Sequence, residues 1–275
     1  MAIVTRLSVK RPRKQEFRAQ PSFLGTVIDN VRLWGPVMAL AILCLGFGIA
    51  DPSFATIDNL QTIASRAAIP TIVATGITFV IIQGSIDLSI EGVMAASSLT
   101  FALTVMNSRT SLDLGVFGIV LGMAVGVLFG LVNGLVVTRF RVPSFMVTLG
   151  IWSASTGIAM LLSGGQPPLI RDGKLRAFGL GQTLGVPNVA IVALVCLIFA
   201  YILQTYTRFG RYSFVIGGGE DLARLSRIPV DRYKTLVFVL SGALAGLAGL
   251  WNRRELVSVT SISDSARCSP RSLLS

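Results

Sequence analysis

The sequence contains no histidine among its 275 residues, and only 13% of them are charged. Without imidazole, His-based catalytic triads and HExxH zinc sites are excluded. Soluble domains usually carry about 25% charged residues, whereas this chain is poor in charge and 52% hydrophobic. The composition therefore predicts that lipid, rather than water, surrounds most of the chain.

Two further chemical signatures are missing. No G-x-x-x-x-G-K-[ST] sequence occurs, and the triple glycine that begins at Gly217 is followed by Glu220 and Asp221, so it lacks the charge complement of a phosphate loop. The three cysteines show neither a disulfide framework nor metal-ligand spacing. We expect no catalytic residue, no cofactor and no metal, and we expect another chain to hydrolyse any ATP.

Seven apolar stretches alternate with polar connections. A membrane-spanning helix needs about 20 predominantly apolar residues. The stretches cover residues 34–50, 61–82, 89–106, 114–137, 144–163, 188–205 and 235–251. They predict an all-α, polytopic transmembrane helical bundle with about seven spans over residues 34–251. A basic N-terminal segment, 1–33, precedes this domain, and a Ser/Arg-rich tail, 252–275, follows it and is expected to be weakly ordered.

Basic residues gather in alternate connections. If the N-terminus is cytoplasmic, fifteen Lys and Arg lie on that side and four lie on the other. The cytoplasmic set is Arg6, Lys10, Arg11, Arg13, Lys14, Arg18, Arg32, Arg139, Arg141, Arg208, Arg211, Arg224, Arg227, Arg232 and Lys234, and the opposite set is Arg109, Arg171, Lys174 and Arg176. Because cytoplasmic loops are enriched in Lys and Arg, the N-terminus and the connections 138–143 and 206–234 are predicted to be cytoplasmic.

Small residues mark one face of two predicted spans. In the stretch 114–137, Gly122, Gly126, Gly130 and Gly134 are four residues apart, and the stretch 235–251 repeats the spacing from Gly242 to Gly249. Such faces let helix backbones approach closely. The pattern fits ordinary helix packing, and it also fits a face beside a translocation path.

Asp87 and Glu91 form an i, i+4 acidic pair beside a predicted span. Asp87 would cap the span, with Glu91 favoured by the helix dipole in the first turn. The alternative is that the pair carries protons in a coupled carrier.

The connection 206–234 contains a short predicted helix, Glu220 to Leu225, after a glycine break, and Pro229 ends it. Its acidic start suits the helix dipole, and its apolar residues are of the kind that dock in a groove. The segment is either a docking site for a cytoplasmic partner or a connector on the membrane surface.

Five blocks then occur in a fixed order. They are Gly84-Ser85-Ile86-Asp87-Leu88-Ser89; Asn133-Gly134-Leu135; Val142-Pro143-Ser144-Phe145-x-x-Thr148-Leu149-Gly150; the segment from Thr207-x-Phe209-Gly210-Arg211-Tyr212 to Ile228; and Ser241-Gly242-x-x-Ala245-Gly246-x-Ala248-Gly249. Over about residues 34–250 the ordered set resembles the ribose/xylose/autoinducer-type sugar permeases of bacterial ABC importers.

The resemblance implies a multi-pass permease subunit of the bacterial inner membrane that imports a sugar or similar small polar solute and is not itself an enzyme. The implied partners are a second permease subunit, a cytoplasmic ABC ATPase and a periplasmic solute-binding protein. The implied coupling segment comprises Gly217, Gly218, Glu220, Asp221, Ala223, Arg224 and Leu225. A second set, Asp87, Gly126, Gly130, Asn133 and Gly134, is expected to serve helix packing or the pathway.

The chain also departs from the family pattern. Gly219 replaces the usual Asn, Leu222 replaces Ala, Arg227 replaces Gly, and Glu91 replaces a small residue. Family members continue past the seventh span with glycine-rich and hydrophobic sequence, so we expect a reading-frame shift near Leu250 and a shortened permease.

Two other functions stay open: a branched-chain amino-acid ABC permease and a secondary carrier that works alone. An intramembrane enzyme is disfavoured, because His and facing catalytic acids are missing.

Overall fold

The computed structural model describes residues 23–164, 168, 179 and 181–267, and it describes side chains between Trp34 and Trp251. The chain divides into a first unit that ends at Asn59 and a second unit that begins at Leu60. The elements are α1 (Phe23–Ala50), η1 (Pro52–Ala55), α2 (Ile57–Ile82), α3 (Ile90–Thr104), α4 (Val116–Phe140), α5 (Ser144–Ser163), β1 (Gln182–Thr183), β2 (Val186–Pro187), α7 (Asn188–Tyr206), α8 (Arg208–Gly218), α9 (Glu220–Leu225) and α10 (Val230–Arg267).

The helices confirm the predicted all-α membrane architecture. Among the described residues, five helices are long and apolar enough to cross a bilayer, namely α2, α4, α5, α7 and the Val230–Trp251 part of α10. Two shorter apolar helices, Trp34–Ala50 and Ile90–Thr104, correspond to the first and third predicted stretches. The chain is therefore a multi-pass membrane protein.

One boundary differs from the sequence analysis. α10 runs as helix to Arg267, sixteen residues beyond Trp251, where weak order was expected. Residues 252–267 contain neither glycine nor proline, and those are the residues that most strongly interrupt a helix. The backbone can therefore continue as helix although the apolar run has ended.

In the first unit, α1 is followed by a tight turn. Asp51 accepts a hydrogen bond from the backbone N–H of Ser53 (2.9 Å) and so caps η1. The rings of Phe47 and Phe54 stack across the turn with centroids 5.8 Å apart.

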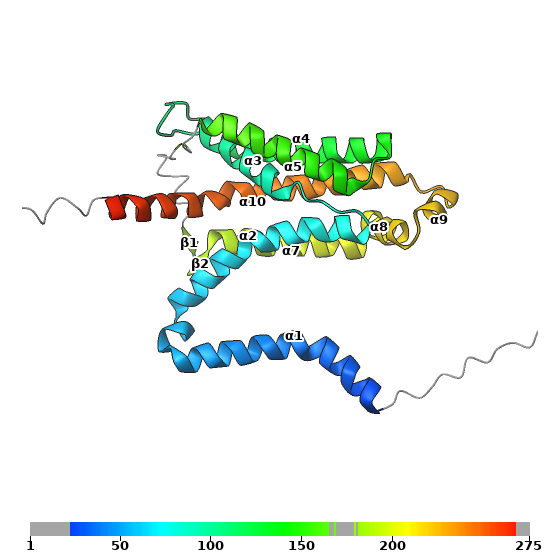
Figure 1. The fold of residues 1–275 in the computed structure, drawn as a ribbon, viewed down its shortest axis with the longest axis horizontal. Coiled ribbons are helices and arrows are strands. Elements are labelled where there is room, and N and C mark those ends of the chain that lie inside the picture. The colour runs from blue at the N-terminus through cyan, green and yellow to red at the C-terminus, as the bar shows by residue number, and fades with distance from the viewer. Residues whose placement is uncertain (1–22, 165–167, 169–178, 180, 268–275) are drawn as a thin grey trace, which may run out of the picture. The chain divides into compact units, whose positions relative to one another are not determined.

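In the second unit α10 is the central helix, with α3, α4 and α5 on one side and α2 and α7 on the other (Figure 1). The buried residues Ile72 of α2, Val189 of α7 and Ala248 of α10 belong to one apolar cluster. Val93 of α3 and Ala245 of α10 belong to another. Of the membrane-length segments, that of α10 is 56% buried and the other four are 22–33% buried.

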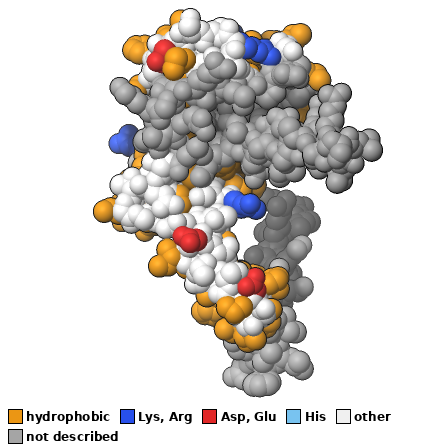
Figure 2. All heavy atoms as spheres, turned by 90° about the vertical axis from the view of Figure 1, so that its left-hand side faces the viewer, with side chains coloured by type: hydrophobic (Ala, Val, Ile, Leu, Met, Phe, Trp, Pro, Cys, Tyr) orange, Lys and Arg blue, Asp and Glu red, His pale blue; other side chains and the backbone are white. Residues whose placement is uncertain are grey.

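The outer faces of the surrounding helices are apolar. Phe117 of α4, Met146 of α5 and Phe199 of α7 expose 69%, 64% and 53% of their surface. Figure 2 views the end of the molecule that carries the β1–β2 turn and shows apolar side chains along its margins, with few charged groups among them. This distribution suits a surface that contacts lipid acyl chains.

Candidate functional site

α8 and α9 form a helical cap at the end of the second unit where α2, α4 and α7 end and α10 begins (Figure 1). The hydroxyl of Thr207 accepts from the N–H of Gly210 and caps α8. The Gly219 N–H donates to the carbonyl of Ile216 (3.2 Å), which ends α8 and redirects the chain into α9. α9 spans Glu220–Leu225, so the predicted short helix is confirmed.

One face of α9 is anchored and the other is open. Ala223 is fully buried in a cluster with Ile216 of α8 and Val230 of α10. On the outer side, Leu222 and Leu225 expose 67% and 81% of their surface. A six-residue helix could not present apolar side chains in a fixed position on its own, so the anchor on α10 is what holds them.

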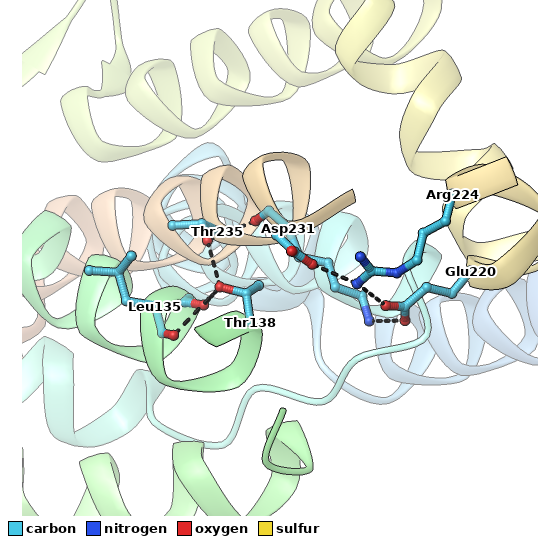
Figure 3. Close-up of polar contacts among 8 residues, drawn as sticks. Leu135, Thr138, Glu220, Arg224, Asp231 and Thr235 are labelled. Carbon is cyan, nitrogen blue, oxygen red and sulfur yellow. Dashed lines mark hydrogen bonds and ion pairs between the residues drawn. The ribbon is translucent and has the colours of Figure 1, made fainter. Parts of the chain in front are cut away.

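Ion pairs fasten α9 to the first turns of α10. Arg224 Nη2 lies 3.0 Å from Glu220 Oε1 and 2.6 Å from Asp231 Oδ1, and Lys234 Nζ pairs with Glu220 Oε2. Figure 3 shows Glu220 and Arg224 directed toward the start of α10, where Asp231 lies. Four charges of alternating sign thus link two helices.

The ion pairs change the acidity of Glu220. Partial burial raises the pKa of its carboxyl, but the hydrogen bonds and charges of Lys234 and Arg224 outweigh burial, so the net pKa is lowered. The hydrogen bonds to Asp231 and Glu220 raise the pKa of Arg224. Both residues are therefore charged at neutral pH.

The remaining residues of the predicted coupling segment have different surroundings. Asp221 is exposed. Gly218 has open space where a Cβ would stand, whereas a Cβ on Gly217 would overlap the carbonyl oxygen of Ile82 at the end of α2. Of these two glycines, only Gly217 brings α8 into backbone contact with the bundle.

The predicted glycine face of α4 lies against α10. A Cβ on Gly134 would stand 2.7 Å from Thr235 Cα, one on Gly130 would stand 3.0 Å from Val239 Cα, and one on Gly126 would stand 2.8 Å from Gly246 Cα. The hydroxyls of Thr138 and Thr235 lie 3.2 Å apart at one end of this contact (Figure 3). We call the contact of Gly126, Gly130 and Gly134 with α10 the glycine seam.

A buried polar network lies beside the seam. Asp87 Oδ1 accepts from the N–H (3.0 Å) and the hydroxyl (2.6 Å) of Ser89, and Asp87 Oδ2 accepts from the hydroxyl of Ser241 (2.8 Å). Asn133 Nδ2 donates to Ser89 Oγ (2.7 Å). The network joins the α2–α3 connection to α4 and α10, so Asp87 and Asn133, which the sequence analysis named separately, belong to one cluster.

The capping interpretation of Asp87 is wrong. Ser89 occupies the N-cap position of α3, and Asp87 binds Ser89 and Ser241 instead of the first-turn amides. Sequence reasoning also missed Ser241 as the partner, since it lies 154 residues away. The signal that was available is the run of polar residues at alternate positions from Gln83 to Ser89.

Comparisons with known proteins agree over most of the chain. Residues 59–265 match a family model described as "Branched-chain amino acid transport system / permease component". The chain is 35% identical to the L-arabinose transport system permease protein AraH of Escherichia coli over 222 residues, which is 80% of this chain and 66% of AraH. It is 34% identical to the ribose import permease protein RbsC of Bacillus subtilis over 217 residues, 78% of this chain and 66% of RbsC.

The chain thus spans slightly less than two thirds of the length of these curated relatives. No solved structure matches it.

Proposed function

The chain belongs to the branched-chain amino acid transport system / permease component family, and on that premise we propose that it is the membrane-spanning permease subunit of an ABC importer for a sugar or similar small polar solute. The relatives described above are named for arabinose and ribose. Those names favour a sugar over the branched-chain amino acids of the family description. We further propose that it resides in the bacterial inner membrane.

The observation that carries the proposal is the anchored, outward apolar pair on α9. Leu222 and Leu225 are exposed while Ala223 is buried and Glu220 and Arg224 are paired with α10. A rigidly mounted apolar helix face suits docking into a groove on a partner. We assign that partner as a cytoplasmic ABC ATPase, whose closure would move α9, α8 and the bundle as a lever.

The distribution of charge supports a cytoplasmic position for this end. Eight described cations lie at or near it, namely Arg139, Arg141, Arg208, Arg211, Arg224, Arg227, Arg232 and Lys234. Fewer lie toward the opposite end, namely Arg66 in the first half of α2, Arg109 in the α3–α4 connection, and Arg253, Arg254 and Arg267 in the last part of α10. The excess of cations on one side favours a cytoplasmic N-terminus. The cations at 6–18 and 171–176 lie outside the described residues.

The remaining partners follow from the same proposal. A second permease subunit would complete the pathway, and a periplasmic binding protein would deliver the solute at the end opposite α9. ATP hydrolysis is assigned to the separate ATPase. The glycine seam and the network around Asp87 and Asn133 are proposed to serve helix packing beside the pathway.

Replacing the two exposed leucines with serine tests the proposal. The double variant Leu222→Ser, Leu225→Ser should lose at least tenfold in co-purification with a co-expressed ABC ATPase that binds the wild-type chain, and it should lose ATP-driven uptake in proteoliposomes. The matched control is Leu184→Ser, because Leu184 is 98% exposed in the β1–β2 turn. Wild-type association of the double variant would refute the docking assignment.

This test is sharper than reversing the charges of Glu220 and Arg224. Both residues also bind α10, through Lys234 and Asp231. A reversal would therefore damage the support of α9 as well as any docking surface, whereas the leucines make no such contact.

Reconstituting the chain without an ATPase distinguishes the proposed permease subunit from a stand-alone carrier. A permease subunit should give no uptake of arabinose or ribose under a proton or sodium gradient. Uptake driven by a gradient alone would favour the carrier.

A further inference from the structure

The connection between α2 and α3, residues 83–89, is an irregular segment whose polar side chains point inward. Gln83, Ser85, Asp87 and Ser89 are 4%, 6%, 7% and 2% exposed. Between them Ile86 and Leu88 expose 52% and 42% of their surface. The segment begins with a tight turn, in which Gly84 has φ of +70° and the Ser85 N–H donates to the carbonyl of Val80 (3.1 Å), and its polar side chains face the protein interior. We call this segment the polar strap.

The first end of the polar strap is fixed to α8. Gln83 Nε2 donates to Ser213 Oγ (3.0 Å), and both side chains are buried. One turn further along α8, a Cβ on Gly217 would overlap the carbonyl oxygen of Ile82. The backbones of α8 and α2 therefore touch, and α8 cannot approach the strap without displacing it.

The middle of the polar strap is fixed to α5. The backbone N–H of Ile86 donates to Ser144 Oγ (3.0 Å), and the hydroxyl of Thr148 donates to the carbonyl of Ile86 (3.3 Å). Both polar groups of one strap residue are thus held by the first turns of a single helix. Irregular backbone at membrane depth is tolerated where protein groups satisfy it in this way.

The far end enters the bundle beside the glycine seam. Asp87 accepts from Ser241 of α10, and Ser89 accepts from Asn133 of α4. Ser241 stands eleven residues after the start of α10, which at 1.5 Å per residue is roughly 16 Å into the helix. The strap therefore connects α8, at the end of the molecule, with the interior of the α4–α10 pair.

We propose that the polar strap is a mechanical relay that transmits displacement of α8 to α4 and α10, with Asp87 as its positioning residue. The direction of transmission, from α9 and α8 inward, rests on the proposed function. The strap is short and held at both ends and in the middle, so a shift of Ile82 is passed along it to α5 at Ile86 and to α10 and α4 at Asp87 and Ser89.

The hydrogen-bonding groups around the polar strap allow the strap to occupy a second, slightly displaced position. Gln83 Oε1 and Asn133 Oδ1 are buried acceptors without a protein donor among the described residues. Each end of the relay thus holds a spare acceptor beside a flexible hydroxyl. Hydrogen bonds broken by a small displacement can re-form with these acceptors, so the displaced state does not leave several buried groups unpaired.

Hydrogen–deuterium exchange on the full chain in phosphatidylethanolamine–phosphatidylglycerol nanodiscs tests the relay. Gly217→Ala forces α8 away from Ile82, and we expect peptides covering 83–89 to exchange at least tenfold faster. Gly218→Ala is the matched control, because its Cβ meets open space, and it should stay within twofold of wild type. If Gly217→Ala does not fold, Gln83→Ala and Ser213→Ala provide milder disturbances of the same contact. Unchanged exchange of 83–89 in the variants that fold would overturn the relay.

Transmission must also run in reverse, since coupling between two sites is reciprocal. Asp87→Ala should accelerate exchange in α8, residues 208–218. Asp87→Asn should restore wild-type exchange, because its oxygen can accept from Ser89 and its amide can donate to Ser241. A purely local structural role would leave α8 unchanged in Asp87→Ala, and that result would refute the proposal. No ATPase is present in these measurements, so their failure would leave the proposed importer function standing, and failed docking of α9 would leave the relay standing.

Discussion

α10 makes two kinds of contact: close backbone packing against α4, and ion pairs with α9. Along its middle it meets α4 through the glycine seam, where backbone lies on backbone and the large side chains point elsewhere. At its start it meets α9 through four charged side chains, of which Glu220 and Arg224 are 39% and 41% exposed. The seam fixes a separation that even one methyl group would change, whereas the charged contact can stretch, re-pair or be screened.

The difference suits the roles proposed for the two ends. Close packing in a membrane relies on short-range contacts between small residues, so α4 and α10 should move as one body. Exposed ion pairs contribute only about 0.2–1 kcal/mol each. They allow the charged side chains to re-pair, while the buried Ala223 holds the α9 backbone against α8 and α10. The seam therefore fixes the helix backbones of the bundle, and at α9 only the charged side chains can rearrange.

The most damaging change should be a methyl group in the seam. Gly130→Ala places a Cβ 3.0 Å from Val239 Cα and closer still to the carbonyl oxygen of Phe238. Neither is a side chain that can rotate away, so the helices must separate, at a cost of about 1–3 kcal/mol or more. We expect a clearly lower midpoint in thermal unfolding of the detergent-solubilised protein.

Gly150→Ala on α5 is the control for this change. It is also a helical glycine, but its Cβ has no neighbour within 4 Å. Alanine is the better helix former, so stability should be unchanged or slightly higher. Equal midpoints for the two variants would show that the seam is not tight.

A smaller effect, of opposite sign, is expected next to α9. Arg227 has φ of +59°, a left-handed conformation that costs a residue with a Cβ roughly 1–2 kcal/mol. Arg227→Gly should remove part of that strain and stabilise the turn by about 0.5–1 kcal/mol, since glycine also loses more backbone entropy. The readout is slower hydrogen exchange of the Ile228 amide, which donates to the carbonyl of Ala223 (3.1 Å).

Arg227→Ala separates strain from charge in that experiment. It removes the guanidinium but keeps the Cβ, so it should not slow exchange. If alanine protects the turn as well as glycine does, charge rather than backbone conformation is responsible.

These two contacts were not equally predictable from sequence. The spans could be predicted because bilayer thickness fixes the length of an apolar run, and α9 could be predicted because Gly219 and Pro229 bracket it. The four-residue spacing identified the glycine face of α4. It could not identify α10 as the partner, because small residues recur in several helices.

The long-range polar contacts could not be predicted from the sequence, for a different reason. Asp87 binds Ser241 and Gln83 binds Ser213, which are 154 and 130 residues away in sequence. Such pairs leave no periodic trace in a single sequence. The positive φ of Arg227 was likewise hidden, although the expected glycine at this position in the resembled family pointed to it.

The smallest effect should come from the charged contact itself. The pKa of Glu220 is lowered from its ordinary 4.5, so the unfolded chain binds the proton more readily than the folded one. The stabilisation is therefore complete above pH 4.5 and is lost as pH falls through the lower, folded value. Glu220→Gln should melt slightly below wild type at pH 7 and equal to it under acid conditions, and 0.5 M NaCl should shrink the difference. Asp221→Asn, an exposed neighbour, should match wild type throughout. A Glu220→Gln deficit that persists below the folded pKa would mean that shape rather than charge holds α9 on α10.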